Sequence, residues 1–393
     1  MRHRLIATGL LLALAGQGSA EWRSEVGLEG RWHWQSALDP AQRDAGLSLH
    51  LLSEYYSSWD NGDQSFTFKP FLRLDQHDRE RTHADIREAV WIHAGADWEL
   101  RAGIDKVFWG VTEVNHLIDI VNQTDLLENP DGEEKLGQPL LKYSLERDWG
   151  TLDAYLLPWF RERAFPGVRG RLRSQPRVAA DRAVYDSNLE QHYPSVALRW
   201  SRSLDDMDIG LAHFHGTARE PRFTLGLDGG MPVLIPHYDT IDQISIDMQA
   251  TAGDWLWKFE ALHRSGQGEG FFAATGGFEY TYVGIADTDA DLGVLMELMY
   301  DERGDAASSP FNHDVFFGLR WAANDVDGTE VLSGVMQDWQ HGTRFFNLEA
   351  SRRIGSRWKA SLQARAWTHA DAQDAAYALH RDDYVEAKLI RYF

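Results

Sequence analysis

Apolar and polar residues alternate one by one over many short stretches of this chain. From Val385 to Leu389, apolar side chains alternate with Glu386 and Lys388. The same pattern recurs along the whole chain, in residues 22–35, 66–75, 98–105, 243–250, 314–321 and 358–366. Because successive side chains of a β-strand point to opposite faces, a period of two predicts strands with one apolar and one polar face. An amphipathic helix would not produce these rows.

The composition indicates which solvent each face of these strands meets. Mean hydropathy is −0.43, which is too polar for a bundle of membrane helices, yet the chain contains 16 Trp, 13 Tyr and 18 Phe. A membrane β-barrel combines these properties, because half of every strand faces water while aromatic residues gather at the two lipid interfaces. We therefore predict an all-β fold, an antiparallel transmembrane β-barrel.

The segments between the predicted strands indicate the size of the barrel. Short Gly- and Asp-containing connections, such as residues 95–97, 252–254 and 354–356, alternate with long ones. The long connections are residues 109–137, 162–192, 216–238, 265–275, 302–312 and 368–380. Tight turns at one end and long loops at the other are typical of such barrels. The alternating segments predict about 18 strands, with 16 as the second choice, in a single domain of residues 21–393.

Residues 1–20 have the features of a removable export signal. Arg2 and Arg4 precede a short apolar run from Leu5 to Ala15, and small residues at 18–20 provide a cleavage site. The apolar run is too short for a membrane-spanning helix. We expect export of the chain in a Gram-negative bacterium, removal of residues 1–20 and insertion into the outer membrane.

The chain is strongly acidic, with a net charge of −21 at pH 7. This charge argues against nucleic acid as a partner. The chain has no Cys, so disulfides, thiolate metal sites and lipid attachment at a cysteine are excluded. We expect outer-membrane lipids and lipopolysaccharide as its surroundings.

Residues 109–137 form a connection that is too apolar for a solvated surface loop. Val111, Ile118 and Val121 are among its apolar residues, and we expect them to pack within the barrel lumen. A loop folded inward narrows a large barrel to a constriction, where charges set ion preference. The candidate charges at this constriction are Glu113, Asp119, Asp125 and Glu128. The alternative is an extracellular cap that never enters the lumen.

The next long connection is basic in an otherwise acidic chain. Its candidate pore-lining residues are Arg161, Arg163, Arg169, Arg171 and Arg173. Guanidinium groups bind phosphate and carboxylate with two parallel hydrogen bonds. Facing inward, the cluster would set up a transverse field opposite the acidic loop; facing outward, it would bind lipopolysaccharide phosphates or acidic loops. Both arrangements remain open, and the first predicts that replacing Arg169, Arg171 and Arg173 with Gln shifts ion selectivity toward cations.

Residues 103–112 read Gly-Ile-Asp-Lys-Val-Phe-Trp-Gly-Val-Thr, and Asp119-Ile120-Val121-Asn122 and Asp125 follow. This segment resembles an uncharacterised family of large porin-like proteobacterial outer-membrane proteins. In that family a strand ending in Trp-Gly leads into an Ile-Asn-Pro-x-Asp loop; here Gln123 stands at the Pro position. The resemblance covers a small part of the chain. It implies a barrel with an inserted loop and does not imply a substrate.

The carboxy-terminal strand ends on Phe393. A terminal aromatic residue of this kind resembles the signal that the barrel-assembly machinery reads. We therefore expect that machinery as a partner of the last strand.

The chain carries no recognisable catalytic motif, because neither His-Glu-x-x-His nor Gly-x-Ser-x-Gly occurs in it. We expect no enzymatic activity, no catalytic residue, no cofactor and no metal site. These features together favour a passive or weakly selective channel for small, charged solutes of unknown identity. The alternative is a non-transporting barrel that serves envelope assembly, polysaccharide export or surface binding.

Overall fold

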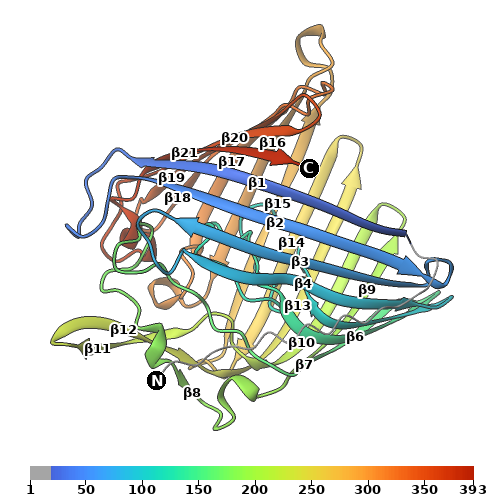
Figure 1. Cartoon of the computed structure of the whole chain (residues 1–393), viewed down its shortest axis with the longest axis horizontal. Coiled ribbons are helices and arrows are strands. Elements are labelled where there is room, and N and C mark those ends of the chain that lie inside the picture. Colours follow the sequence, from blue (N-terminus) through green and yellow to red (C-terminus); the bar gives the residue numbers. More distant parts are fainter. Residues whose placement is uncertain (1–18) are drawn as a thin grey trace.

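The computed structural model describes residues 19–393, so almost all of the predicted export signal lies outside the described residues. Eighteen strands form one antiparallel sheet. In it, β1 (Ser19–His33) pairs with both β2 (Ala45–Trp59) and β21 (Tyr384–Tyr392), which closes the sheet into a barrel. Figure 1 shows the first strand in blue beside the last strand in red. The prediction of an 18-stranded barrel is confirmed, and the 16-stranded alternative is wrong.

The other barrel strands follow one another along the chain. They are β3 (Gln64–Asp75), β4 (His83–Ala94), β5 (Trp98–Asp105), β6 (Gln138–Arg147), β7 (Gly150–Leu157), β9 (Ser195–Leu204), β10 (Met207–Thr217), β13 (Thr240–Ala252), β14 (Trp255–Ser265), β15 (Phe271–Tyr282), β16 (Asp291–Asp301), β17 (His313–Ala322), β18 (Glu330–Asp338), β19 (Arg344–Ile354) and β20 (Trp358–Thr368). Short 3-10 helices lie in the connections: η1 (Asp60–Gly62), η2 (Ala180–Arg182), η3 (Glu190–His192), η4 (Ile285–Asp287), η5 (Gly304–Ala306) and η6 (Ala375–Leu379).

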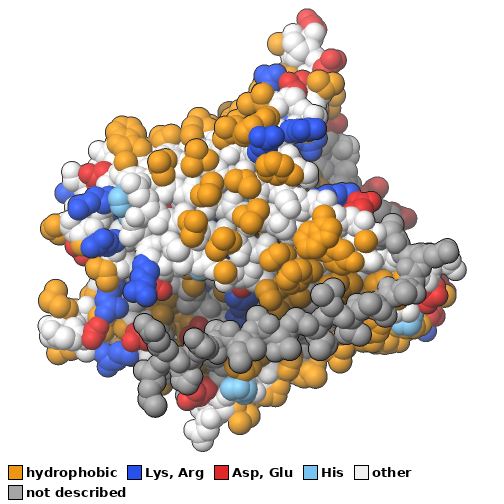
Figure 2. Space-filling model, in the orientation of Figure 1, with side chains coloured by type: hydrophobic (Ala, Val, Ile, Leu, Met, Phe, Trp, Pro, Cys, Tyr) orange, Lys and Arg blue, Asp and Glu red, His pale blue; other side chains and the backbone are white. Residues whose placement is uncertain are grey.

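The strands place apolar side chains on the outside of the barrel. In β1, Leu28 and Trp32 are 52% and 55% exposed, whereas Glu29 between them is 2% exposed. Phe317 and Leu319 of β17 are exposed in the same way. Figure 2 shows hydrophobic side chains spread over this outer face, with charged side chains mainly near the two ends. An apolar outer band of this kind is the surface that a membrane barrel presents to lipid.

Long loops lie at one end of the barrel and short turns at the other, as the connection lengths predicted. The segment predicted as a plain loop at 216–238 instead contains a hairpin, β11 (Arg222–Asp228) and β12 (Met231–Tyr238), and β8 (Val184–Tyr185) pairs with β12. Figure 1 shows this hairpin projecting beyond the barrel at its long-loop end. Predicted loop 265–275 is also shorter than expected, because β15 already begins at Phe271.

Several charged side chains on the inner face of the barrel are buried. Arg73, Glu260 and Glu297 point inward and are at most 2% exposed. Polypeptide inside the barrel covers them: residues 106–137, which connect β5 to β6 and are called the inner loop below. The prediction that this loop folds inward is confirmed by its contacts with the inner wall. No helix in residues 19–393 is long and apolar enough to cross a membrane.

Candidate functional site

The two ends of the inner loop are held together by one buried amide. Asn122 Oδ1 accepts a hydrogen bond from Val107 N at 2.9 Å. Its Nδ2 donates to Asp105 O at 2.9 Å and to Leu136 O at 2.8 Å. Asn122 is 1% exposed, so these bonds form away from competing water. The two ends of the loop, near Asp105 and Leu136, are therefore linked to each other through Asn122.

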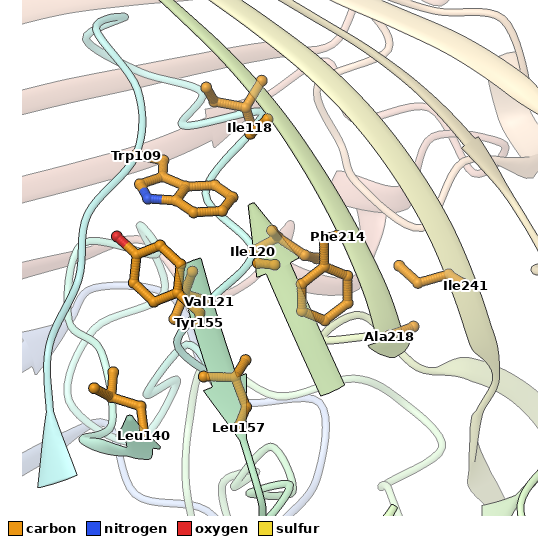
Figure 3. Close-up of a cluster of buried hydrophobic side chains, with 12 residues drawn as sticks. Trp109, Ile118, Ile120, Val121, Leu140, Tyr155, Leu157, Phe214, Ala218 and Ile241 are labelled. Carbon is orange, nitrogen blue, oxygen red and sulfur yellow. The ribbon is translucent and has the colours of Figure 1, made fainter. Parts of the chain in front are cut away.

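The first half of the inner loop packs against one side of the barrel wall through an apolar cluster (Figure 3). Ile118 and Val121 are completely buried, and Trp109 meets Tyr155 of β7 edge-on at 5.6 Å between ring centroids. The cluster also includes Leu140, Leu157, Ala197, Ala212, Phe214, Ala218 and Ile241, from β6 to β13. Side chains at these inner positions of a water-filled barrel would be polar. Their apolar character is explained by the loop that covers them.

A single carboxylate of β14 binds the turn that follows Trp109. Glu260 Oε1 accepts hydrogen bonds from Val111 N at 2.6 Å and from both Thr112 N and Thr112 Oγ1 at 2.8 Å. Its Oε2 accepts a fourth from Ile118 N at 3.2 Å. Gly110 makes this approach possible: its φ is +134°, and a Cβ there would lie 2.8 Å from Glu260 Oε1. The Trp-Gly pair in the sequence is thus the point where the loop turns onto the wall.

A second carboxylate, on β16, holds the next residues of the loop. Glu297 accepts hydrogen bonds from Glu113 N at 2.6 Å and from Val114 N at 3.0 Å. The Glu113 side chain itself binds Arg320 of β17 at 2.7 Å and Lys258 of β14 at 3.5 Å. Burial would raise the pKa of Glu113, but Arg320 and Lys258 outweigh it and lower that pKa. The loop therefore reaches across the lumen to the opposite wall.

The acidic tip of the inner loop binds arginines of the wall. Asp125, which is fully buried, accepts a hydrogen bond from Arg87 of β4 at 2.7 Å. Glu128 accepts one from Arg73 Nε of β3 at 2.8 Å. Asp131, beyond them, pairs with Arg365 of β20 at 2.6 Å. Of the four acidic candidates, Asp125 and Glu128 thus anchor the tip of the loop to the barrel, and Glu113 anchors an earlier part of it.

The remaining acidic candidate, Asp119, is paired within the inner loop. Its Oδ2 lies 3.1 Å from Lys135 Nζ, and its Oδ1 accepts a hydrogen bond from Trp109 N at 3.3 Å. Burial raises the pKa of Asp119 even though Lys135 lies beside it. This contact links the first and last parts of the loop.

One group of described residues, His83, Asp125 and Glu128, brings ligand atoms close enough for a metal ion. Both carboxylates already accept hydrogen bonds from Arg87 and Arg73, so positive charge is supplied by the protein itself. A divalent cation would have to displace these guanidinium groups, and the donor set therefore fits a metal poorly.

We expect the ion pairing of Glu128 with the wall arginines to be constant near neutral pH and to be lost in acid. Burial would raise the pKa of Glu128, but Arg73, Arg81 and Arg87 outweigh it and lower that pKa. A carboxyl whose folded pKa is below its unfolded pKa stabilises the fold above the unfolded value, and this contribution is lost as pH falls through the folded value. Protease protection of residues 106–137 should therefore persist until the pH drops below about 4.

The matched variant for this pH prediction is E128Q, which has no titrating group at this position. This variant should protect the inner loop from protease less well at neutral pH. Its protection should not fall further in acid through protonation at position 128. Loss of wild-type protection already in mildly acidic buffer would contradict the assignment of the anchor to Glu128.

The five candidate arginines are separated by the fold. Arg161 and Arg163 lie over the inner loop: Arg161 Nη1 donates to Gly137 O at 2.8 Å, and Arg163 Nε donates to Gln123 Oε1 at 3.1 Å. Arg161 also pairs with Asp85 at 2.8 Å. Arg161 and Arg163 therefore contact the inner loop directly.

The other three arginines lie among the long loops. Arg171 pairs with Asp382 at 2.6 Å and with Asp44 at 2.7 Å, and Arg173 pairs with Asp39 at 2.8 Å. Arg169 is exposed and lines a small pocket between the loops, as Arg171 does. Arg171 and Arg173 thus join separate loops through charge-assisted hydrogen bonds. The selectivity change on replacing these three residues stays a prediction.

One continuous cavity of about 1070 Å³ lies beside the inner loop. Along β17 its lining extends from Asp314, near the long-loop end of the barrel, to Arg320, near the turn end. Along β20 it extends from Trp367 to Lys359 in the same direction. Glu113, Asp119, Arg163 and Arg173 are the candidate residues that line it. The cavity therefore follows the barrel axis between the loop and the wall formed by β14–β21.

Several residues that build this site were not among the sequence candidates: Asn122, Glu260, Glu297, Arg73, Arg87 and Arg365. The alternating pattern does place the strand residues on the polar face. However, lumen-facing charges occur in most strands, and nothing in the sequence marks which of them meet the loop. Asn122 lay within the segment singled out for its resemblance, and that was the one available signal.

No protein-family model matches the chain, and no curated protein matches it either. Solved structures with similar folds include a loop-deletion mutant of OmpT, an outer membrane protein of Vibrio cholerae. That chain has a TM-score of 0.48 and 10% identity, over 96% of this chain and 99% of its own. A triple mutant of the Rhodopseudomonas blastica porin has a TM-score of 0.45 and 10% identity, over 95% and 100%. The barrel fold is established by the closed 18-stranded sheet of the chain itself. Likeness at this level carries no function across to this chain.

Proposed function

We propose that this chain is a diffusion channel of the bacterial outer membrane, narrowed by the inner loop. The observation that supports this most is the continuous cavity between the loop and the wall of β14–β21, lined from one end of β17 to the other. A barrel with a plugged lumen would have loops filling that space. A path of this kind passes small solutes and excludes large ones by size.

The surroundings of the channel follow from its surface. The apolar outer band would meet outer-membrane lipid, and the long loops would meet lipopolysaccharide. We propose that residues 1–20 direct export and that the strand ending in Phe393 is recognised by the barrel-assembly machinery. In the folded barrel Phe393 N donates a hydrogen bond to Ser24 O, so the last residue also takes part in closing the sheet.

The test of the channel is electrical. The protein without residues 1–20 would be refolded and its single-channel current recorded in a planar bilayer under a salt gradient. Steady conductance is the expected result, and the sign of the reversal potential reports the preferred ion charge. A folded, heat-resistant barrel without conductance would contradict the proposal and favour a non-transporting barrel for binding or assembly.

We further propose that charges lining the cavity steer ions. Of the arginine candidates, Arg163 and Arg173 line it, and of the acidic candidates, Glu113 and Asp119 do. Glu113 and Asp119 are paired with basic groups and Arg173 is paired with Asp39, which reduces the effect of all three on the lumen. Among the four, Arg163 has no ion-pair partner in residues 19–393 and should contribute most. Replacing Arg163 and Arg173 with Gln should therefore shift the reversal potential toward cation preference. An unchanged reversal potential in a conducting variant would rule out this steering.

A further inference from the structure

Three arginines from three separate segments meet around one carboxylate in the cavity. Arg163 follows β7, Arg264 belongs to β14 and Arg303 follows β16, and all three line the cavity with Glu220. Arg264 Nη1 lies 3.3 Å from Glu220 Oε2. Burial would raise the pKa of Glu220, but Arg264, Arg163 and Arg303 outweigh it and lower that pKa. Ser308 Oγ also links Arg303 Nη1, at 3.4 Å, to Glu220 Oε2, at 3.1 Å. Arg264 and Arg303 are thus joined to Glu220 by contacts, and Arg163 lines the same cavity.

The positive charge of this cluster is not fully balanced by the protein. Arg303 is paired with Asp301, at 2.9 and 2.6 Å, and Arg264 is paired with Glu220. Within residues 19–393, no carboxylate lies within ion-pair distance of Arg163, whose only side-chain hydrogen bond runs from Nε to Gln123 Oε1. Arg219, next to Glu220 in the chain, also lines the cavity, and it too has no carboxylate within ion-pair distance in residues 19–393. Four positive charges thus meet two negative ones. The terminal nitrogens of Arg163 are donors without an acceptor among the described residues.

The cluster is held in place before any ligand arrives. The Phe271 ring lies next to both Arg264 and Arg303, whose Cζ atoms are 5.6 and 3.6 Å from its centroid. Arg264 Nε also donates to Gln243 at 2.9 Å. A binding group that is already ordered loses less side-chain entropy on binding.

An apolar surface lies in the same cavity. Phe165 and Phe223 also line it, and their rings meet edge-on with centroids 5.9 Å apart. Phe165 is two residues from Arg163, so the arginine and the aromatic pair belong to one stretch of lining. A positive site beside an aromatic wall selects ligands that combine a negative group with an apolar body.

We propose that this cluster is a binding subsite for a small carboxylate-bearing solute with an apolar group, which uses Arg163 for its carboxylate and Phe165 and Phe223 for its apolar part. A guanidinium offers a carboxylate two parallel hydrogen bonds. The donors of Arg219 are used on the carbonyl oxygens of Val121 and Thr217, so Arg163 is the arginine that can offer its terminal nitrogens to one carboxylate. The proposal rests on the channel function and names the class of solute.

Benzoate is the probe, with benzyl alcohol and benzylamine as neutral and positive analogues of similar size. Benzoate should reduce the single-channel current in a saturable way, at concentrations where the two analogues have little effect. Loss of one charge-assisted contact in R163Q should weaken this block by about tenfold or more. E220Q should strengthen the block, because it removes a competing negative charge from the cluster.

The matched control is R344Q, which removes the same charge from an exposed arginine at the long-loop end of β19. It should leave the block unchanged. The subsite would be overturned if benzoate and benzyl alcohol blocked the current equally. It would also be overturned if R163Q did not weaken the benzoate block or E220Q did not strengthen it. If the barrel does not conduct, calorimetry with benzoate in detergent micelles tests the subsite separately. If benzoate binds the silent barrel and R163Q weakens that binding, the subsite is supported although the channel function has failed. If benzoate does not bind, the subsite is overturned together with the channel function.

Discussion

Replacing Glu260 and Glu297 with Ala should release the inner loop from the β14–β16 wall while the barrel itself remains closed. The two carboxylates accept backbone hydrogen bonds from five residues of the loop: Val111, Thr112, Glu113, Val114 and Ile118. Each buried donor left without an acceptor costs about 1–3 kcal/mol. Local opening, which lets water satisfy these groups, then becomes the favourable response.

Hydrogen exchange measures this opening directly. Since about 1.4 kcal/mol corresponds to a factor of ten, amides of residues 110–118 should exchange at least about tenfold faster in the double variant. Strand amides should keep their protection, and channel recordings should become noisier with a larger mean current. E54A is the matched control, because Glu54 lies on β2 and Lys69 is its one ion-pair partner within residues 19–393. Unchanged exchange in the E260A/E297A variant would show that the apolar cluster and the ion pairs of the loop hold it without these two carboxylates.

Replacing Arg73 with Ala should weaken both the attachment of the loop tip at Glu128 and the barrel wall at Glu29. Arg73 is 2% exposed and pairs with Glu29 of β1 at 3.0 Å and with Glu128 of the loop. Its removal leaves two buried carboxylates with less compensating charge, and such losses typically cost about 3–5 kcal/mol. Denaturant unfolding followed by Trp fluorescence should show a correspondingly lower stability in R73A.

Two further variants separate charge from geometry at this anchor. R73K keeps the charge but loses the planar group that reaches both carboxylates, so its stability should lie between wild type and R73A. R23Q removes an exposed arginine paired with Glu21 on the same barrel wall, and it should change stability by less than about 0.5 kcal/mol. A stability of R73A equal to that of R23Q would contradict the role of this network.

The alternating pattern was sufficient to predict the barrel because it reports a local property. Leu28 and Glu29 have opposite exposures for the same reason that any two successive strand residues do. The apolar residues of the connection after β5 also indicated that it folds inward, since Ile118 and Val121 have no place on a solvated surface. The strand count, the closed sheet and the inner loop could all be predicted in this way.

The partners of the charged residues could not be predicted, because they depend on distances between segments far apart in the chain. Asp125 and Glu128 look like pore charges in the sequence, yet they bind Arg87 and Arg73 and anchor the loop. Arg171 looks like a residue of the pore wall, yet it pairs with Asp382 of another loop. A period of two places a charge on the lumen side but carries no information about which opposite charge it meets. Those pairs, and the cavity left beside them, follow from how the loops pack inside the closed barrel.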